Sequence, residues 1–170
     1  MRVPTSAVAF VALACTSPPH GKGPAPQLAP LIGTWRLQSL VDTLPDGSAY
    51  RWLGEYPSGE IRYDAAGRMA VQFMRDPRPV SALGDVASAA PEELRAIVDG
   101  YYAYFGRYEL NARGDTVSHF VEASLRPDEV GIVYRRAVHL DGDALQISLA
   151  FISSADSLRH RRFLVFRRVR

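Results

Sequence analysis

The amino-acid sequence predicts a mainly β protein, a single antiparallel barrel of about 8–10 strands with one inserted α-helix at about residues 91–104. From residue 31 onward, apolar and polar residues alternate in short stretches, and turn sequences separate one stretch from the next. One stretch breaks this alternation with apolar residues at helical spacing. Because a long series of hairpins would leave strand edges bare, closure into a barrel is the expected arrangement.

Length and charge exclude several classes of protein. The chain has 170 residues, enough for one well-buried domain. Its 20 basic and 18 acidic side chains give a net charge of +2, which is too even for a nucleic-acid-binding protein. The single cysteine, Cys15, has no partner for an internal disulfide, so packing alone must stabilise the fold. The even charge balance predicts no nucleic-acid partner. No glycine-rich phosphate loop is present and no cofactor is expected, and the sequence does not indicate an oligomeric state.

The amino terminus is typical of an exported bacterial protein. Residues 1–14 combine Arg2 with an apolar run that is too short to span a bilayer, as in a signal peptide. Residues 12–15, Ala-Leu-Ala-Cys, resemble a lipobox, in which the signal is cleaved before the cysteine and the thiol is lipidated. Cys15 is therefore the predicted lipidation site, and a conventional signal peptide with an incidental cysteine is the alternative.

Residues 15–30 are the predicted tether of a barrel domain at residues 31–170. This segment is rich in proline and glycine and has little apolar surface to bury. Thr16, and not an aspartate, follows Cys15, and by resemblance to lipoprotein sorting signals this favours the outer membrane. We expect an outer-membrane-anchored lipoprotein facing the periplasm, with a soluble periplasmic protein as the alternative.

Four strands are predicted before the helix. The first, at residues 33–41, opens with Gly33, Thr34 and Trp35, and its tryptophan has a large apolar surface with one N–H group. Residues 45–47, Pro-Asp-Gly, form a turn because proline presets φ and glycine accepts a positive φ. The other three strands are expected at residues 49–53, 60–64 and 68–74, and a glycine-containing hairpin loop joins the last two.

The inserted helix begins with Ala-Pro-Glu-Glu at residues 90–93. Proline suits the first helical turn, and the two acidic residues interact favourably with the helix macrodipole. Apolar side chains then recur at helical spacing, namely Leu94, Ile97, Val98, Tyr101, Tyr102 and Phe105. We therefore expect a helix from Pro91 to Tyr104 whose apolar face covers another part of the protein.

The alternating pattern of strands returns after Gly106. Strands are expected at residues 107–111 and 115–125, then at 131–140 and 143–152, and finally at 161–169. Asp141-Gly142 between two of these strands is a strong hairpin signal, because both positions of a tight type I′ turn need a positive φ. The carboxyl-terminal half is therefore predicted to be a series of antiparallel hairpins.

Several short motifs together resemble the bacterial and fungal lipocalin-like domain family over residues 31–170. They are Leu-Ile-Gly-Thr-Trp (31–35), Ile-Arg-Tyr-Asp-Ala-Ala-Gly-Arg-Met (61–69), Gln-Phe-Met-Arg (72–75), Tyr-Phe-Gly-Arg-Tyr (104–108), Val-Ser-His-Phe-Val-Glu-Ala-Ser-Leu (117–125) and Leu-Asp-Gly-Asp-Ala-Leu (140–145). The resemblance implies a lipocalin-like barrel whose interior suits a small apolar ligand, and it implies no single activity. Lipocalins also pack an arginine of the last strand over the tryptophan of the first. This implies structural roles for Gly33 and Trp35, with Arg168 favoured over Arg167 as the arginine.

The candidate ligand-binding residues are aromatic and polar groups on the predicted strands and on or just after the predicted helix, which could close one barrel end. They are Tyr63, Gln72, Phe73, Tyr101, Tyr104, Phe105, His119, Tyr134 and Arg136. His119 shares its face with valines, so it is either a satisfied core histidine or a group that contacts ligand. Arg136 alternates with apolar residues, and a buried guanidinium needs an acceptor, either in the protein or on a ligand.

Three hypotheses of function remain open. The leading one is an envelope-located, non-enzymatic protein that binds a small hydrophobic or amphipathic molecule in the barrel. The second is a cofactor-independent isomerase or cyclase in which His119 transfers a proton and Arg136 or Tyr63 polarises an oxygen. The third is a structural envelope protein whose own aromatic side chains fill the barrel. A metal site is not expected, because His119 and Glu122 are three residues apart and point to opposite faces of a strand.

Overall fold

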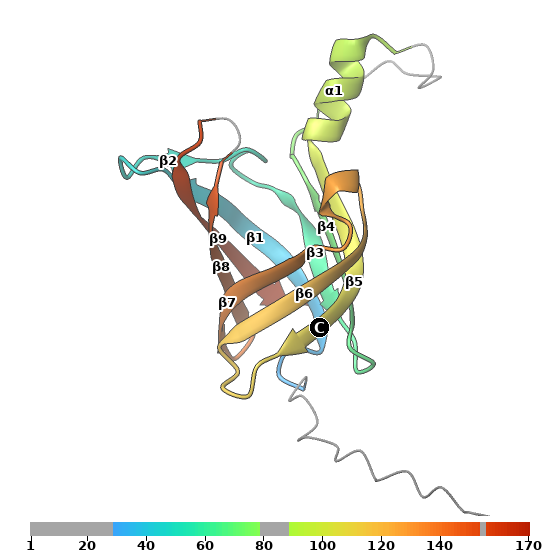
Figure 1. Ribbon diagram of the computed structural model, residues 1–170, viewed down its shortest axis with the longest axis vertical. Helices are drawn as coiled ribbons and strands as arrows, with labels where there is room; N and C mark the ends of the chain where they lie inside the picture. Colours follow the sequence, from blue (N-terminus) through green and yellow to red (C-terminus); the bar gives the residue numbers. More distant parts are fainter. Residues whose placement is uncertain (1–28, 79–88, 154–155) are drawn as a thin grey trace, which may run out of the picture.

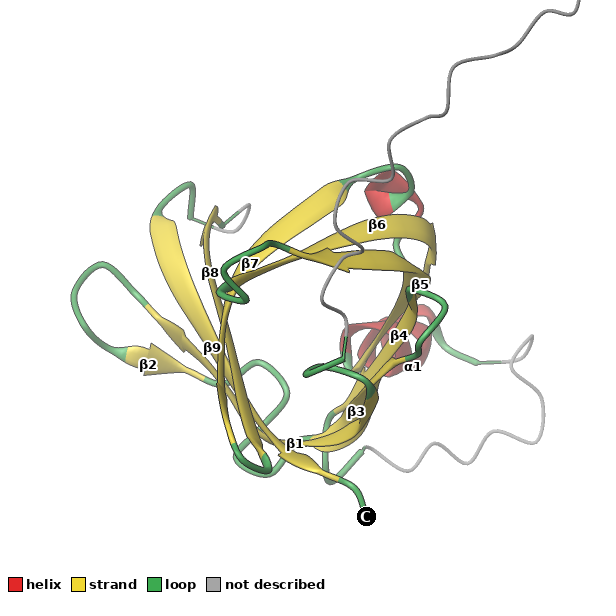
Figure 2. Ribbon diagram, turned by 90° about the horizontal axis from the view of Figure 1, so that it is seen from below, coloured by secondary structure: helices red, strands yellow, loops and turns green. Residues whose placement is uncertain are grey.

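Eight long antiparallel strands close into one barrel in the computed structural model, which describes residues 29–78, 89–153 and 156–170 (Figures 1 and 2). Each strand pairs with the next, and pairing of β1 with β9 closes the barrel. The strands are β1 (Gly33–Thr43), β3 (Ser58–Tyr63), β4 (Arg68–Met74), β5 (Tyr101–Leu110), β6 (Thr116–Ser124), β7 (Val133–Asp141), β8 (Ala144–Ile152) and β9 (Arg159–Arg168). The mainly β fold and the closed barrel are confirmed.

Three short elements complete the described structure: β2 (Ala49–Tyr50), α1 (Pro91–Asp99) and the 3-10 turn η2 (Pro127–Glu129). β2 pairs only with the end of β1, so the predicted strand at 49–53 is reduced to two residues. The predicted signal peptide, its Cys15 and all of the tether except residues 29–30 lie outside the described residues. Within the described ranges, no helix has the length and apolar character needed to cross a membrane.

The inserted helix is shorter than the sequence predicts. It ends at Asp99, and the expected continuation to Tyr104 is wrong because Tyr101 begins β5 and pairs with Met74 of β4. The aromatic residues after Gly100 fit a period of two as well as a helical period. In the structure they follow the period of two, because this segment pairs as a β-strand. The inner face of β5 therefore carries Tyr102, Tyr104, Gly106, Tyr108 and Leu110.

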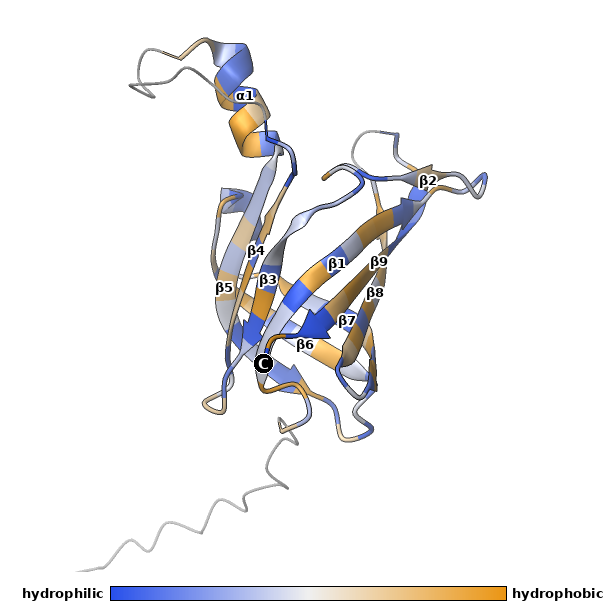
Figure 3. Cartoon of the chain, turned by 180° about the vertical axis from the view of Figure 1, so that it is seen from behind, coloured by the Kyte–Doolittle hydropathy of each residue, from blue (hydrophilic) through white to orange (hydrophobic). Residues whose placement is uncertain are grey.

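The expectation that α1 covers another part of the protein is also wrong for the described residues. None of its side chains is buried, and Val98 is 50% exposed. Figure 3 shows α1 extending beyond one end of the barrel, with apolar residues on the turn nearest the strands. Local signals explain why it is helical, since Pro91 opens it and the Glu93 carboxylate accepts a bond from the Ala90 N–H at 3.2 Å.

One end of the barrel is closed by a tryptophan beneath an arginine. Trp35 is fully buried, and its Nε1–H donates to the carbonyl of Leu31 at 2.8 Å. The Arg168 guanidinium lies 4.0 Å from the centre of the indole ring and donates to the carbonyls of Ile32 and Pro30. Gly33 has a φ of +138°, and a Cβ there would lie 2.8 Å from the Arg168 guanidinium. Glycine at this position therefore leaves room for the Arg168 side chain.

A second glycine brings β5 and β6 together. A Cβ on Gly106 would lie 1.9 Å from the carbonyl oxygen of Phe120, so no larger residue fits at this position. The pairing of the two strands shifts register between Phe105 and Gly106, as in a β-bulge. This close approach brings the interior side chains of β5 next to those of β6, where His119 lies.

Candidate ligand-binding site

A cluster of polar side chains occupies the middle of the barrel around His119. The Tyr63 hydroxyl lies 2.8 Å from Nε2 of this histidine, and the Tyr104 hydroxyl lies 2.7 Å from Nδ1. Nη1 of Arg136 donates to the Tyr104 oxygen at 2.5 Å and lies 3.2 Å from Nδ1. Four strands thus contribute one side chain each: β3, β5, β6 and β7.

These contacts determine the tautomer of His119. A guanidinium can only donate, so Nδ1 must be the acceptor toward Arg136, and the Tyr104 hydroxyl donates to it as well. Nε2 then carries the proton and donates to Tyr63. Burial, together with the nearby Arg136 charge, holds the pKa of His119 well below its usual value of 6.5, so the ring is neutral at pH 7.

The tyrosines of this cluster remain protonated. Burial raises the pKa of both Tyr63 and Tyr104 above the ordinary value of 10. The charge of Arg136 is therefore not balanced by a phenolate. Aromatic faces stabilise it instead, since the guanidinium carbon lies 4.8 Å from the ring centre of Tyr134 and 5.5 Å from that of Tyr104.

The open end of the barrel holds a cavity of about 840 Å³. Its walls come from the ends of β1 and β2, the ends of β4 and α1, the turn between β6 and β7, and the β8–β9 connection. Its lining is both aromatic and charged: it includes Trp52, Tyr102, Tyr134 and Phe151 together with Asp99, Arg126, Glu129, Arg136, Asp156, His160 and Arg162. This volume and aromatic lining match sites that enclose one small organic molecule. We call this cavity the mouth.

Ion pairs and hydrogen bonds fix the walls of the mouth. Arg162 makes two bonds to the buried carboxylate of Asp42, at 2.6 and 2.7 Å, and its guanidinium lies 5.3 Å from the ring centre of Trp52. On the opposite side, Glu129 accepts from the Tyr102 hydroxyl at 3.1 Å and from Ser124 at 2.7 Å. Both acids thus have donors, and the mouth is held in shape before any ligand enters.

The sequence-predicted residues divide into three groups. Tyr134 and Arg136 line the mouth, and Phe73 lines a small chamber at its base. Tyr63, Tyr104 and His119 lie deeper in the filled part of the barrel and do not line the mouth. The remaining three lie on outer strand faces: Gln72, Tyr101 and Phe105.

Gln72, Tyr101 and Phe105 were candidate ligand-binding residues, and the structure places them on outer strand faces, away from the mouth. Successive side chains of a strand alternate between faces. Because Phe73 and Tyr104 point inward, Gln72 and Phe105 must point outward, and Phe105 is 50% exposed. Tyr101 is half-buried on the outer face, where the Arg78 guanidinium lies 5.8 Å from its ring centre.

The sequence did not predict several of the residues that line the mouth. Tyr102 was assigned to a helix, although its alternation with Tyr104 and Tyr108 would have placed it inside a barrel. Trp52 lies outside any regular strand, so no periodicity marks it. Asp42 and Arg162 are 120 positions apart, and only the β1–β9 pairing that closes the barrel brings them together.

The geometry does not provide the proposed acid–base pair. His119 is fully buried, and its ring nitrogens are bound to Tyr63, Tyr104 and Arg136. The isomerase hypothesis requires His119 and Arg136 to share one open cavity, and only Arg136 lines the mouth. Among the described residues, no group of three or more His, Cys, Asp or Glu side chains is placed to hold a metal ion.

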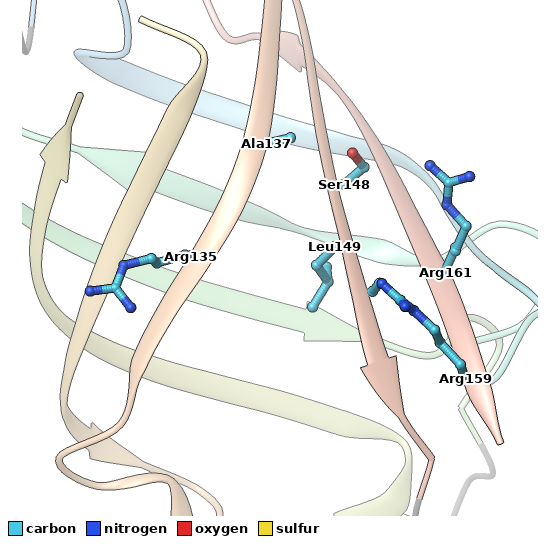
Figure 4. A pocket seen from close by; sticks show the side chains of 7 residues that line it. Arg135, Ala137, Ser148, Leu149, Arg159 and Arg161 are labelled. Atoms are coloured by element: carbon cyan, nitrogen blue, oxygen red, sulfur yellow. The ribbon is translucent and has the colours of Figure 1, made fainter. Parts of the chain in front are cut away.

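A second hollow, of about 660 Å³, lies on the outer face of β7, β8 and β9 (Figure 4). Arg135, Arg159 and Arg161 line it together with small side chains such as Ala137 and Ser148. None of these three arginines forms an ion pair with another described residue. This surface is basic and is separate from the interior polar cluster.

A closed eight-stranded barrel with a hollow end defines a class of small β-barrels that can enclose one ligand. Comparison with known families agrees with this class: residues 32–169 match the model of the lipocalin-like domain. The chain belongs to the lipocalin-like domain family.

One relative is a protein of Aspergillus oryzae (strain ATCC 42149 / RIB 40) described as a 4'-hydroxy-3'-methoxypropiophenone carrier protein. It is 31% identical to this chain over 107 residues, which are 59% of this chain and 96% of the relative. The matched relative is therefore almost entirely a domain of this kind, and its description is that of a carrier.

Proposed function

We propose that this protein is a non-enzymatic carrier that binds one small, largely apolar molecule with an aromatic ring in the mouth of the barrel. The observation that carries the proposal is the cavity of about 840 Å³, whose lining includes Trp52, Tyr102, Tyr134 and Phe151. Aromatic walls favour a flat apolar ligand through burial of surface and through ring contacts. Four arginines in the same lining add polar groups that can orient it: Arg75, Arg126, Arg136 and Arg162.

The description of the Aspergillus oryzae relative supports the same class of ligand. That protein is described as the carrier of an aromatic ketone. The present chain has the same family fold and an aromatic-lined mouth. Since His119 is enclosed by its own hydrogen bonds and does not line the mouth, carriage without chemical change fits the mouth better than proton transfer by His119.

Titration of the protein with propiophenone tests the proposal. We expect saturable binding with one site per chain, seen by calorimetry and by a change in tryptophan fluorescence as Trp52 contacts the ligand. The ligand should be recovered unchanged after extraction. Absence of binding to propiophenone, propylbenzene and 3-phenylpropanoate alike would overturn the proposed function.

We propose in addition that the carrier works in the bacterial envelope, anchored through Cys15. The support is the signal-like sequence of residues 1–15. Expression of the full chain with a radiolabelled fatty acid should label the protein in the membrane fraction, and Cys15→Ser should remove the label. Equal labelling of both forms, or an uncleaved cytoplasmic protein, would contradict this location.

A further inference from the structure

Two buried N–H groups at the base of the mouth have no acceptor among the described residues. They are Nε of Arg136 and Nε1 of Trp52. Arg136 is only 8% exposed, and its Nη1 is already used by Tyr104 and His119. A buried donor without a partner is unfavourable, and most such groups in folded proteins are satisfied. Both side chains therefore require an acceptor that the described chain does not supply.

Both side chains line the same small chamber. Its volume is about 30 Å³, which is room for one oxygen-sized group and not for a whole ligand. Apart from Trp52, Arg136, Arg162 and Tyr102, its lining is apolar: Leu40, Phe73, Leu149 and Leu164. Of these eight residues only Leu149 also lines the second hollow, whereas five also line the mouth: Trp52, Tyr102, Arg136, Leu149 and Arg162.

The charges around the chamber favour an acceptor and not a donor. Arg162 is neutralised by Asp42, with bonds of 2.6 and 2.7 Å. Arg136 forms no ion pair with a carboxylate of the described residues. Burial raises the pKa of its neighbours Tyr104 and Tyr134, which remain protonated. No direct ion pair thus neutralises Arg136 at the chamber, where low polarity strengthens its attraction for a partial or full negative charge.

We infer that the chamber is a subsite for an acceptor oxygen of the ligand, a carbonyl or carboxylate oxygen that accepts from Arg136 and Trp52 while the aromatic body of the ligand fills the mouth. The inference rests on the proposed function and adds to it the chemical class and the orientation of the ligand. A hydroxyl group fits less well, because it brings a donor of its own toward two donors.

The matched compounds propiophenone and propylbenzene test this assignment, because they differ only in that a carbonyl replaces a methylene. We expect propiophenone to bind at least about tenfold more tightly, since propylbenzene leaves both N–H groups unpaired. 3-Phenylpropanoate, measured in parallel, distinguishes a carboxylate from a carbonyl as the preferred acceptor. Tighter binding of either oxygen-bearing compound supports the subsite.

The two tryptophans of the chain provide matched variants. Trp52→Phe keeps an aromatic ring and removes the unpaired N–H, so the preference for the ketone should fall about threefold to tenfold while propylbenzene binding changes little. Trp35→Phe removes an N–H that is already bonded to Leu31 at the closed end, so the preference should persist. Arg136→Met should reduce the preference further if the variant folds.

The outcomes separate the subsite from the carrier function. Equal affinity for propiophenone, 3-phenylpropanoate and propylbenzene would overturn the subsite and leave the carrier intact. An undiminished ketone preference in Trp52→Phe would also overturn it. Binding of none of the compounds would overturn the carrier function and the subsite together.

Discussion

The two ends of the barrel each contain one of the two tryptophans of the chain, and the environments of these residues differ. At the closed end, Trp35 is fully buried, its N–H is bonded to Leu31, and Arg168 covers its ring. At the mouth, Trp52 is half-buried and its N–H has no acceptor among the described residues. Arg162 lies over its ring, as Arg168 lies over that of Trp35.

The difference between the two ends shows which residues stabilise the fold and which are available to bind a ligand. Where every polar group is paired and every surface is buried, side chains stabilise the fold and offer nothing to a ligand. Where donors remain unpaired beside a cavity, the protein has less local stability and a reason to bind. Substitutions at the closed end should therefore change the free energy of unfolding, and substitutions at the mouth should chiefly change affinity.

The largest effect is expected for Trp35→Ala. Loss of the fully buried indole, and of its contact with the Arg168 guanidinium, should lower the free energy of unfolding by about 3–5 kcal/mol. Urea denaturation followed by circular dichroism measures it. Trp52→Ala is the matched control and should lower stability by clearly less. Equal losses for the two variants would remove the distinction between the two ends.

His119→Leu should have the next largest effect. Leucine is apolar and leaves the Tyr63 and Tyr104 hydroxyls without the ring nitrogens they contact, so the free energy of unfolding should fall by about 2–4 kcal/mol. His139→Leu, on an exposed position of β7, is the control and should change stability by less than about 0.5 kcal/mol. A stable His119→Leu protein would show that the interior polar cluster adds no stability.

The pH dependence of the free energy of unfolding should reveal the lowered pKa of His119. Because the pKa of His119 in the folded protein is held well below 6.5, the unfolded chain binds the proton more readily. The contribution of this residue is fully present above pH 6.5 and is lost as the pH falls toward the folded pKa, by up to about 1.4 kcal/mol per pH unit.

Denaturation curves of the wild type and of His119→Leu from pH 7.5 to 5 isolate that contribution. The difference in free energy of unfolding between the two proteins should narrow as the pH falls below 6.5, since only the wild type loses the contribution of neutral His119. A difference that stays constant across this range would contradict a neutral, buried His119.

The smallest effect is expected outside the barrel, at α1. Val98 is 50% exposed and the helix buries no side chain, so Val98→Ala should change the free energy of unfolding by less than about 0.5 kcal/mol. Alanine also has the higher helix propensity, which offsets any lost contact. A loss above 1 kcal/mol by thermal or urea denaturation would place α1 among the stabilising elements.

Local sequence signals predicted most of the barrel. Period-two alternation and turn residues located its strands, and the Pro-Glu-Glu sequence located the start of α1. They failed at residues 101–104, because the run of aromatic residues satisfies both periods and only pairing with β4 selects one. The same error made Tyr101 and Phe105 candidate ligand contacts on or after the helix, and it left Tyr102 out of the candidates.

The sequence by itself determined the strand-rich closed fold, the place of Trp35 in the first strand and the inward direction of His119 and Arg136, because alternation along a strand is a local property. Tertiary structure alone decided which interior groups reach the mouth. Barrel closure joins Asp42 to Arg162 across 120 positions and encloses His119 among tyrosines. It also leaves Arg136 and Trp52 with unpaired donors, since hydrogen-bond satisfaction depends on neighbours that are distant in the chain.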